Sequence, residues 1–192
     1  MAIVINGSGT VTGLAVGGLP DGTVDSGTIA TGTILPADMA NGGNKVVQIV
    51  YVQDGALATG TTVLPYDDTI PQNTEGDEYL TLAITPSSAT NKLNIQVELM
   101  LGASTGQWMT CALFQDTTAG ALDANSYWHE DSGRITNLSL NYTMVAGTTS
   151  VTTLKVRIGL GAAGTTSLNG VNGARDLGGV SIASMTITEY EV

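Results

Sequence analysis

Two neighbouring stretches with strict alternation of apolar and polar residues constrain the fold most strongly. They cover residues 78–85 and 92–101. Their alternating apolar residues are Leu80, Leu82 and Ile84 in the first, and Leu93, Ile95, Val97, Leu99 and Leu101 in the second. Successive side chains of a β-strand point to opposite faces, so each stretch predicts a half-buried strand. The intervening residues 86–91 are too long for a two-residue hairpin and are typical of a loop at the end of a β-sandwich.

Further strands are predicted wherever β-branched, aromatic or alternating residues gather. They are residues 46–52, 61–64, 108–114, 138–145, 151–160 and 181–190, with a weaker candidate at 165–168. The near-continuous apolar character of residues 46–52 predicts burial on both faces, one of them against a neighbouring subunit. No stretch has helical periodicity. About eight strands separated by turn signals predict an all-β, antiparallel two-sheet sandwich over residues 45–192, most economically a jelly roll.

Residues 1–44 form a separate compositional zone, which is rich in Gly and contains no Lys, Arg or aromatic residue. The unit x-Gly-Thr-[Val/Ile]-x occurs three times in succession, between Asp21 and Leu35. One aliphatic residue in every five matches neither a strand nor a helix. We predict an extended arm that makes spaced contacts with another surface, or with symmetry copies of itself, through Val11, Leu14, Val24, Ile29 and Ile34. The alternative is a flexible Gly-rich leader in the free chain.

Composition narrows the possible partners and the location. The 192 residues carry a net charge of −11, and the six Lys and Arg residues are scattered, so the sequence predicts no nucleic-acid partner. The single Cys111 cannot form an intrachain disulfide and is expected to be a buried small hydrophobe. Neither a secretory signal nor a stretch of about 20 apolar residues is present, which predicts synthesis in a cytoplasm and no membrane insertion. Few charges and much Gly and Thr fit a virion component.

One aromatic cluster is the best candidate for recognition. Tyr127, Trp128 and His129 precede Glu130 and Asp131, and exposed aromatic rings beside hydrogen-bonding groups are good anchors for a glycan or a protein. The alternative is a strand edge with Tyr127 or Trp128 tucked into the end of the sandwich. One His cannot supply a multi-His zinc site, and no nucleophile has a partner at a known spacing. The sequence therefore predicts a non-enzymatic protein with no catalytic residue, metal or cofactor.

Carboxylates are concentrated around a Pro-containing loop, and they raise the question of calcium. They are Asp67, Asp68, Glu75, Asp77 and Glu78. Their order differs from the helical calcium-binding loop, so solvated charge is the favoured interpretation, and calcium binding requires their oxygens to converge. The Gly-rich stretches 7–9 and 159–164 lack the phosphate-binding Lys and the following helix, and they are expected to be turns.

Two pairs of motifs resemble tail-fibre-like structural proteins of tailed bacteriophages. In the leader they are residues 5–14 (INGSGTVTGL) and 17–22 (GGLPDG), and in the second zone residues 68–78 (DTIPQNTEGDE) and 84–93 (ITPSSATNKL). The resemblance implies a homotrimeric virion surface protein with a jelly-roll head, whose arm, residues 1–44, docks on the virion or on neighbouring copies through its aliphatic residues. Unlike a long fibre, the chain has no coiled-coil or collagen shaft between leader and head.

Three functions are therefore considered for the chain. The first is a short tail fibre or receptor-binding spike, with a host glycan or protein as its partner. The second is a capsid decoration, or cement, protein whose arm clamps other virion proteins. The third is a carbohydrate-active enzyme, which is disfavoured because no acid and base pair is indicated by spacing.

Overall fold

The computed structural model describes residues 45–191, so the arm and its contact residues Val11, Leu14, Val24, Ile29 and Ile34 lie outside the described residues. The described chain is all-β and antiparallel, as predicted, with one short 3-10 turn at Leu177–Gly179. The strands are β1 (Val46–Asp54), β2 (Ala58–Gly60), β3 (Asp77–Ile84), β4 (Lys92–Ala103), β5 (Trp108–Gln115), β6 (Asp123–Trp128), β7 (Ile135–Val145), β8 (Thr152–Leu160), β9 (Thr166–Leu168), β10 (Gly170–Val171), β11 (Ala174–Arg175) and β12 (Ala183–Tyr190).

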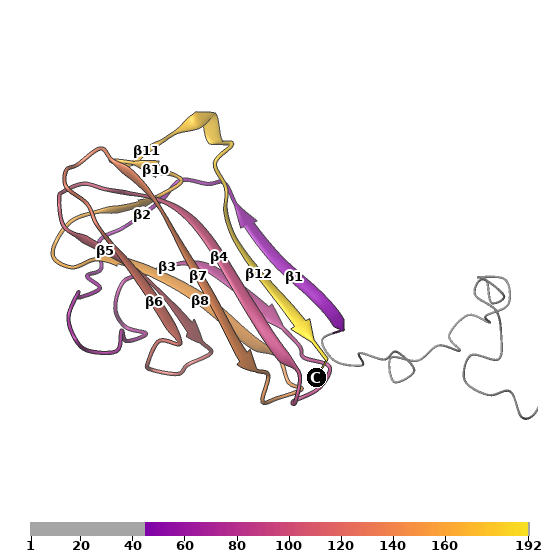
Figure 1. Cartoon of the computed structure of the whole chain (residues 1–192). Helices are drawn as coiled ribbons and strands as arrows, with labels where there is room; N and C mark the ends of the chain where they lie inside the picture. Colours follow the sequence, from indigo (N-terminus) through magenta and orange to yellow (C-terminus); the bar gives the residue numbers. More distant parts are fainter. Residues whose placement is uncertain (1–44, 192) are drawn as a thin grey trace, which may run out of the picture. The chain divides into compact units, whose positions relative to one another are not determined.

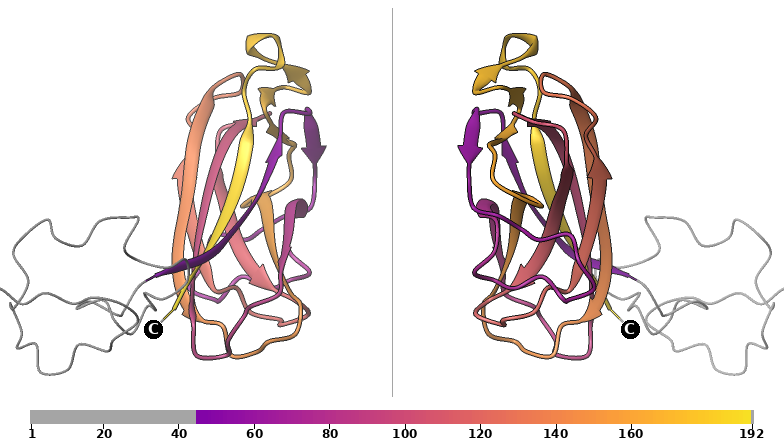
Figure 2. Two further views of the ribbon diagram at one scale, coloured as in Figure 1. Left: turned by 90° about the vertical axis from the view of Figure 1, so that its right-hand side faces the viewer. Right: turned by 90° about the vertical axis from the view of Figure 1, so that its left-hand side faces the viewer.

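Eight of these strands form a jelly roll. One sheet has the order β1-β12-β4-β7, and the other has the order β3-β8-β5-β6. Apart from the β5–β6 hairpin, each connection between successive members of these eight strands passes from one sheet to the other, which is the double Greek-key arrangement. Figure 1 shows the two layers, and the panels of Figure 2 view the sandwich from opposite sides. The predicted jelly-roll sandwich is confirmed.

The two alternating stretches build the centre of the core from opposite sheets. On β4, the side chains of Leu93, Ile95, Val97, Leu99 and Leu101 are all buried. On β3, Leu80 and Ile84 are buried and Leu82 packs against the same cluster. The loop 86–91 therefore connects the sheets at one end of the sandwich, as expected. Burying a large aliphatic side chain stabilises the fold by about 1.5–3 kcal/mol, so this pair of strands is a main source of stability.

Strand β4 is long enough to pair with two different strands along one of its edges. Residues from Lys92 to Glu98 pair with β12, whereas Leu101 to Ala103 pair with β9. The segment between β9 and β12 carries the β10–β11 hairpin and the 3-10 turn, and it projects at one end of the sandwich (Figure 1). At the opposite end, the backbone N–H of Glu191 donates to the carbonyl of Lys45 at 2.9 Å. The head therefore has two distinct ends.

The outer face of β1 corrects one expectation. Residues 46–52 do form a strand, but burial on both faces is wrong for the single chain. Val47, Ile49 and Tyr51 point outwards, and Ile49 and Tyr51 are 57% and 68% exposed. Val50 and Val52 pack against the core from the inner face. An exposed apolar row on an edge strand is a site for pairing with another chain, so β1 remains a candidate subunit contact.

The long loop 61–76 covers the outer face of the second sheet, and the short strand predicted at 61–64 is wrong. Leu64 instead inserts beneath the loop and forms a small separate core with Ala112 and Phe114 of β5. Arg157 anchors the other end of the loop, because its Nε and Nη2 donate to the carbonyls of Glu75 and Gly76 at 2.8 and 2.7 Å. These bonds to backbone acceptors fix the loop without regular secondary structure.

A buried carboxylate joins three segments near the Lys45 end. Glu189 on β12 is fully buried and accepts hydrogen bonds from Gln48 Nε2 at 2.5 Å and Asn91 Nδ2 at 2.6 Å. Ser87 adds its N–H and its hydroxyl, both at 2.8 Å. Burial alone raises the pKa of a carboxyl group, but these donors outweigh it and lower the pKa of Glu189 to about 2. The ionised side chain ties β1 and the β3–β4 loop to β12.

No helix within residues 45–191 has the length and the apolar character that crossing a membrane requires.

Candidate functional site

Three aromatic rings form a continuous surface, here called the aromatic ledge and defined as Tyr66, Trp108 and Trp128. Trp108 and Trp128 are paired across β5 and β6, and their ring centroids lie 5.6 Å apart in an edge-to-face arrangement. Tyr66, on the loop 61–76, stacks on Trp108 with centroids 3.9 Å apart and ring planes 12° apart. Trp108 thus contacts both of the other rings, so the ledge is preorganised.

A cleft of about 160 Å³ adjoins the ledge. Its lining is Pro65, Tyr66, Asp67, Thr69, Pro71, Thr110, Ala124 and Ser126. Thr110 and Ser126 lie next to the two Trp residues in the β5–β6 register, and their hydroxyl oxygens are 2.9 Å apart. Asp67 Oδ1 accepts hydrogen bonds from both the N–H and the hydroxyl of Thr69, which lower the pKa of this carboxyl. The cleft therefore presents hydroxyls and one ionised carboxylate beside aromatic rings.

The predicted cluster Tyr127, Trp128 and His129 is divided between two faces. Trp128 points outwards to the ledge, whereas Tyr127 points the other way and contacts the ring of His129 at a centroid distance of 5.5 Å. Tyr127 and Trp128 are similarly exposed, at 49% and 47%. The structure therefore does not bring the three side chains together in one patch, and it leaves neither Tyr127 nor Trp128 fully tucked in.

His129 and Cys111 are both buried. Neither ring nitrogen of His129 has a hydrogen-bond partner among residues 45–191, and desolvation lowers the pKa of its imidazole. Burial also favours the neutral form of Cys111, because it raises the pKa of the thiol to about 12. Cys111 is therefore a buried small hydrophobe, as predicted. A neutral, enclosed imidazole and a protonated thiol are poorly suited to acid–base or nucleophilic chemistry.

The carboxylates around the loop 61–76 have separate partners, apart from Asp68, which is exposed. Asp77 accepts from the N–H and hydroxyl of Thr62, and Glu75 accepts from the N–H of Gln72. Glu78 lies 3.8 Å from Lys155 Nζ and 3.7 Å from Arg157 Nη1. Within residues 45–191, no group of three or more His, Cys, Asp or Glu side chains is placed to hold a metal ion. The carboxylates thus stabilise the loop.

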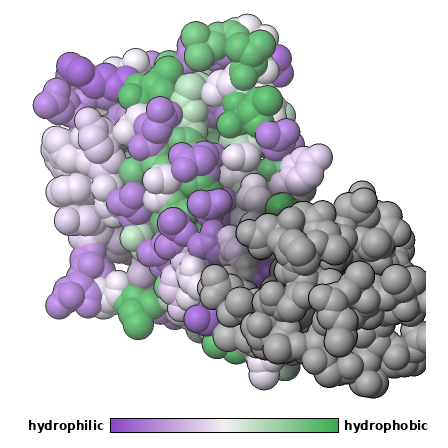
Figure 3. Space-filling view, turned by 45° about the vertical axis from the view of Figure 1, so that its right-hand side comes forward, coloured by the Kyte–Doolittle hydropathy of each residue, from purple (hydrophilic) through white to green (hydrophobic). Residues whose placement is uncertain are grey.

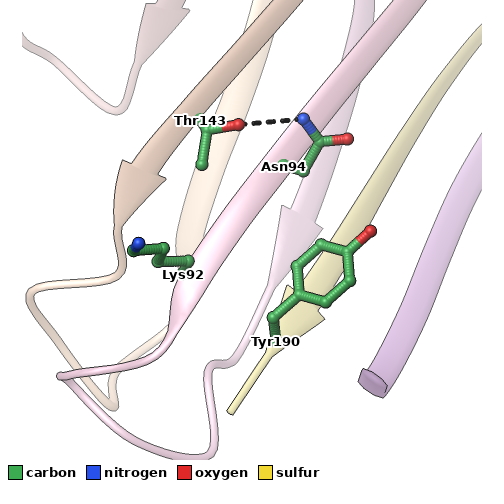
Figure 4. A pocket seen from close by; sticks show the side chains of 4 residues that line it. All are labelled: Lys92, Asn94, Thr143 and Tyr190. Carbon is green, nitrogen blue, oxygen red and sulfur yellow. Dashed lines mark hydrogen bonds between the residues drawn. The ribbon is translucent and has the colours of Figure 1, made fainter. Parts of the chain in front are cut away.

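Beyond the apolar row on β1, the outer face of the β1-β12-β4-β7 sheet is a second, more polar surface. Figure 3 shows many hydrophilic side chains over its middle and a hydrophobic group at the end that carries the 3-10 turn. Near the other end, Lys92, Asn94, Thr143 and Tyr190 line a depression of about 380 Å³ (Figure 4). Asn94 Nδ2 donates to Thr143 Oγ1 at 3.0 Å and to Asn141 Oδ1 at 2.9 Å. Asn94 and Thr143 are thus already bonded within the sheet, which leaves fewer polar groups for a ligand.

The turn after β11 exposes apolar side chains. Leu177 and Val180 are among the most exposed large hydrophobic residues described, and Ile182 follows them. Leu177 has φ = +50°, a left-handed conformation that costs a residue with a Cβ roughly 1–2 kcal/mol. The N–H of Gly179 donates to the Asp176 carbonyl and the N–H of Val180 to that of Leu177, which closes the turn. This apolar turn lies at the end of the head away from Lys45 (Figure 1).

Sequence reasoning missed two of the three ledge residues. The sequence predicts Trp108 in a strand and Tyr66 in a loop, and nothing in their spacing connects them with Trp128. The strand β6 was also missed, because its residues 123–128 contain no β-branched side chain. The alternation of Ala124, Ser126 and Trp128 was the available signal, since these residues share the outer face.

Comparisons with known proteins give no assignment. No family model matches the chain, and no curated protein sequence matches it. A CBM4 structure is similar at 18% identity, over 67% of this chain and 76% of that chain, with a TM-score of 0.38. The structure of infectious bursal disease virus Gt strain is similar at 10% identity, over 77% of this chain and 39% of that chain, with a TM-score of 0.37. The enzymatically active domain of bacteriophage CBA120 tailspike protein 4 is similar at 14% identity, over 66% of this chain and 19% of that chain, with a TM-score of 0.28. Structural neighbours thus include viral and phage tailspike proteins, at low identity. With TM-scores of 0.38 or less, these three likenesses assign no function to this chain.

Proposed function

We propose that this protein is a non-enzymatic structural protein of a tailed-phage virion. Its arm, residues 1–44, docks on the particle, and its jelly-roll head is displayed outwards as a short tail fibre or receptor-binding spike. The motif resemblance in both zones of the sequence supports the virion role. The burial of His129 and Cys111 supports a function in binding rather than catalysis.

The observation that carries the proposal is that the residue following the arm and the aromatic ledge lie at opposite ends of the head. Lys45, the residue that follows the arm, is bonded to Glu191 at one end of the sandwich. The aromatic ledge lies at the other end, because β4 runs away from Lys92 and the chain then enters β5 at Trp108. A head tethered through Lys45 would therefore present the ledge and the apolar turn away from its anchor.

The exposed row on β1 supports self-association, which we propose as a homotrimer. Val47, Ile49 and Tyr51 would be covered by a neighbouring copy, as expected of an exposed edge strand. Replacing Ile49 with Asp should convert the assembled protein to monomer, as measured by light scattering at high concentration. The matched control Thr59→Asp lies on the short strand β2 and should leave the assembly intact. A wild-type protein that is monomeric in solution and in the particle would end the trimer proposal.

Particle labelling tests the virion role. Gold-labelled antibody against the head should mark the tail tip of purified particles, and a chain lacking residues 1–44 should fold but fail to join them. Absence of the protein from purified particles would overturn the proposal.

The second candidate is a capsid decoration protein. The three successive Gly-Thr-aliphatic units favour it, since regularly spaced apolar contacts suit a repeating lattice. Label covering the capsid, together with earlier thermal rupture of full heads after deletion of residues 1–44, would select this candidate over the tail fibre.

A further inference from the structure

We propose that the aromatic ledge and its cleft bind a neutral glycan. The inference rests on the proposed role of the head as the displayed part of a virion protein, and it assigns the ligand class and the residues. It departs from the sequence prediction, because it excludes Tyr127 and His129 and includes Tyr66 and Trp108.

Ring geometry is the first argument. Trp128 and Tyr66 are both about half exposed, whereas Trp108 lies between them and holds both through ring contacts. Sugar rings present flat C–H faces that pack on exposed aromatic rings, with hydroxyls around their edges. A rigid pair of half-exposed rings is therefore matched to a short run of sugar units, and it loses little conformational entropy on binding.

The polar groups of the cleft are the second argument. Each hydroxyl can donate once and accept twice, so the single bond between Thr110 and Ser126 leaves one hydroxyl proton free to donate. At Asp67, both bonds from Thr69 end on Oδ1, and Oδ2 accepts no hydrogen bond from residues 45–191. The cleft thus combines a free donor with a free carboxylate oxygen, which suits sugar hydroxyls that donate and accept.

Charge selects among glycans. The cleft contains Asp67, and none of its lining residues among the described part of the chain is Lys or Arg. The whole chain carries a net charge of −11. An acidic polysaccharide would therefore meet repulsion without a compensating cation, whereas a neutral one would not.

The test uses the untagged full chain and an array of neutral and acidic bacterial surface polysaccharides. The chain has two Trp residues, both in the ledge, so all tryptophan emission reports on this site. Purified neutral glycans from array hits should change the emission in a saturable way, and acidic glycans should not. Affinity, measured by calorimetry, should fall at least about 10-fold in Trp128→Ala and in Tyr66→Ala.

Tyr127→Ala is the matched control, since Tyr127 is as exposed as Trp128 and lies on the same strand but faces the other way. It should bind like the wild type. If Trp128→Ala loses the circular dichroism signal of the β-sheet, that variant has unfolded. The glycan affinity of the loop variant Tyr66→Ala then tests the proposal alone. The proposal is overturned if no neutral glycan binds, if acidic glycans bind equally well, or if Tyr66→Ala leaves affinity unchanged. It is also overturned if Trp128→Ala blocks particle adsorption without any glycan binding, which would indicate a protein receptor.

The two proposals can fail separately. Glycan binding by a protein that is absent from particles would remove the virion role and keep the site. A particle protein that binds no neutral glycan would keep the role and remove the site.

Discussion

Tyr127 and Trp128 are adjacent in sequence and equally exposed, yet they belong to opposite faces of β6. Trp128 meets Trp108 edge to face, and Tyr127 meets His129. Side-chain alternation along the strand accounts for the separation. The pair therefore offers a substitution and its control at neighbouring positions.

The first prediction concerns coupling between the two Trp rings. Trp128→Leu should abolish the exciton-coupled tryptophan band in circular dichroism, because the rings lie 5.6 Å apart. It should also lower the free energy of unfolding by about 0.5–1.5 kcal/mol, from the lost ring pair alone. Tyr127→Leu should leave the band in place. A band that persists in Trp128→Leu would contradict the ledge geometry.

The second prediction concerns Glu189. Its pKa is lowered from 4.5 to about 2, so the stabilisation is present above pH 4.5 and is lost as the pH falls towards 2. The full loss is about 3 kcal/mol. Glu189→Gln should lower stability by about 1–3 kcal/mol at neutral pH, since its amide would face donors from Ser87 and Asn91. Chemical denaturation at several pH values measures both effects.

Glu191→Gln is the control for that experiment, because Glu191 is exposed. This variant should have the same free energy of unfolding as the wild type, with the same dependence on pH. Equal effects of the two substitutions would show that the buried network does not stabilise the head.

The third prediction concerns His129, the single His of the chain. Burial lowers its pKa from 6.5, so the unfolded chain binds a proton more readily and stability should fall as the pH drops below 6.5. His129→Phe should flatten the stability curve between pH 6.5 and 4.5, below which Glu189 begins to contribute. The NMR titration of the sole imidazole in untagged protein gives the pKa directly. A value at or above 6.5 would contradict the enclosed site.

The fourth prediction concerns the loop 61–76. A Cβ at Gly159 would lie 2.7 Å from Leu64 N and Thr62 O, which are backbone atoms that cannot yield without moving the loop. Gly159→Ala should cost about 1–3 kcal/mol and displace Tyr66 from Trp108. Limited proteolysis should then cut within the loop while the sandwich stays intact.

Gly161→Ala is the corresponding control. Its Cβ would find its nearest neighbours at 3.6 Å, an ordinary contact, so the loop should stay resistant to protease. Resistance in Gly159→Ala as well would mean that the loop is not pressed against β8.

The sandwich could be predicted because its core obeys a local rule. Alternation on β3, β4 and β8 is visible in the sequence, and the strong preference for burying Leu, Ile and Val decides which face turns inwards. The estimate of about eight strands favoured the jelly roll. The strand order could not be predicted, because it depends on pairing between segments far apart in the sequence, such as β1 and β12.

The candidate site was only partly predictable, because it depends on non-local contacts. Tyr66 reaches Trp108 only after Leu64 and Arg157 have fixed an irregular loop, and loops carry no periodic signal. Trp128 was identified as an exposed aromatic. Its grouping with Tyr127 and His129 followed sequence adjacency, which in a strand places neighbours on opposite faces.

The division of one edge of β4 between β12 and β9 has a consequence for engineering. Because the two partners pair with different lengths of β4, the exposed turn 177–180 between them can be exchanged without altering the register of either, while the buried Asn169 stays bonded to Met100. Leu177 and Val180 in this turn are largely exposed, so the turn has little packing to lose. This segment is the natural place to graft a foreign peptide, with the sandwich serving as a rigid display scaffold.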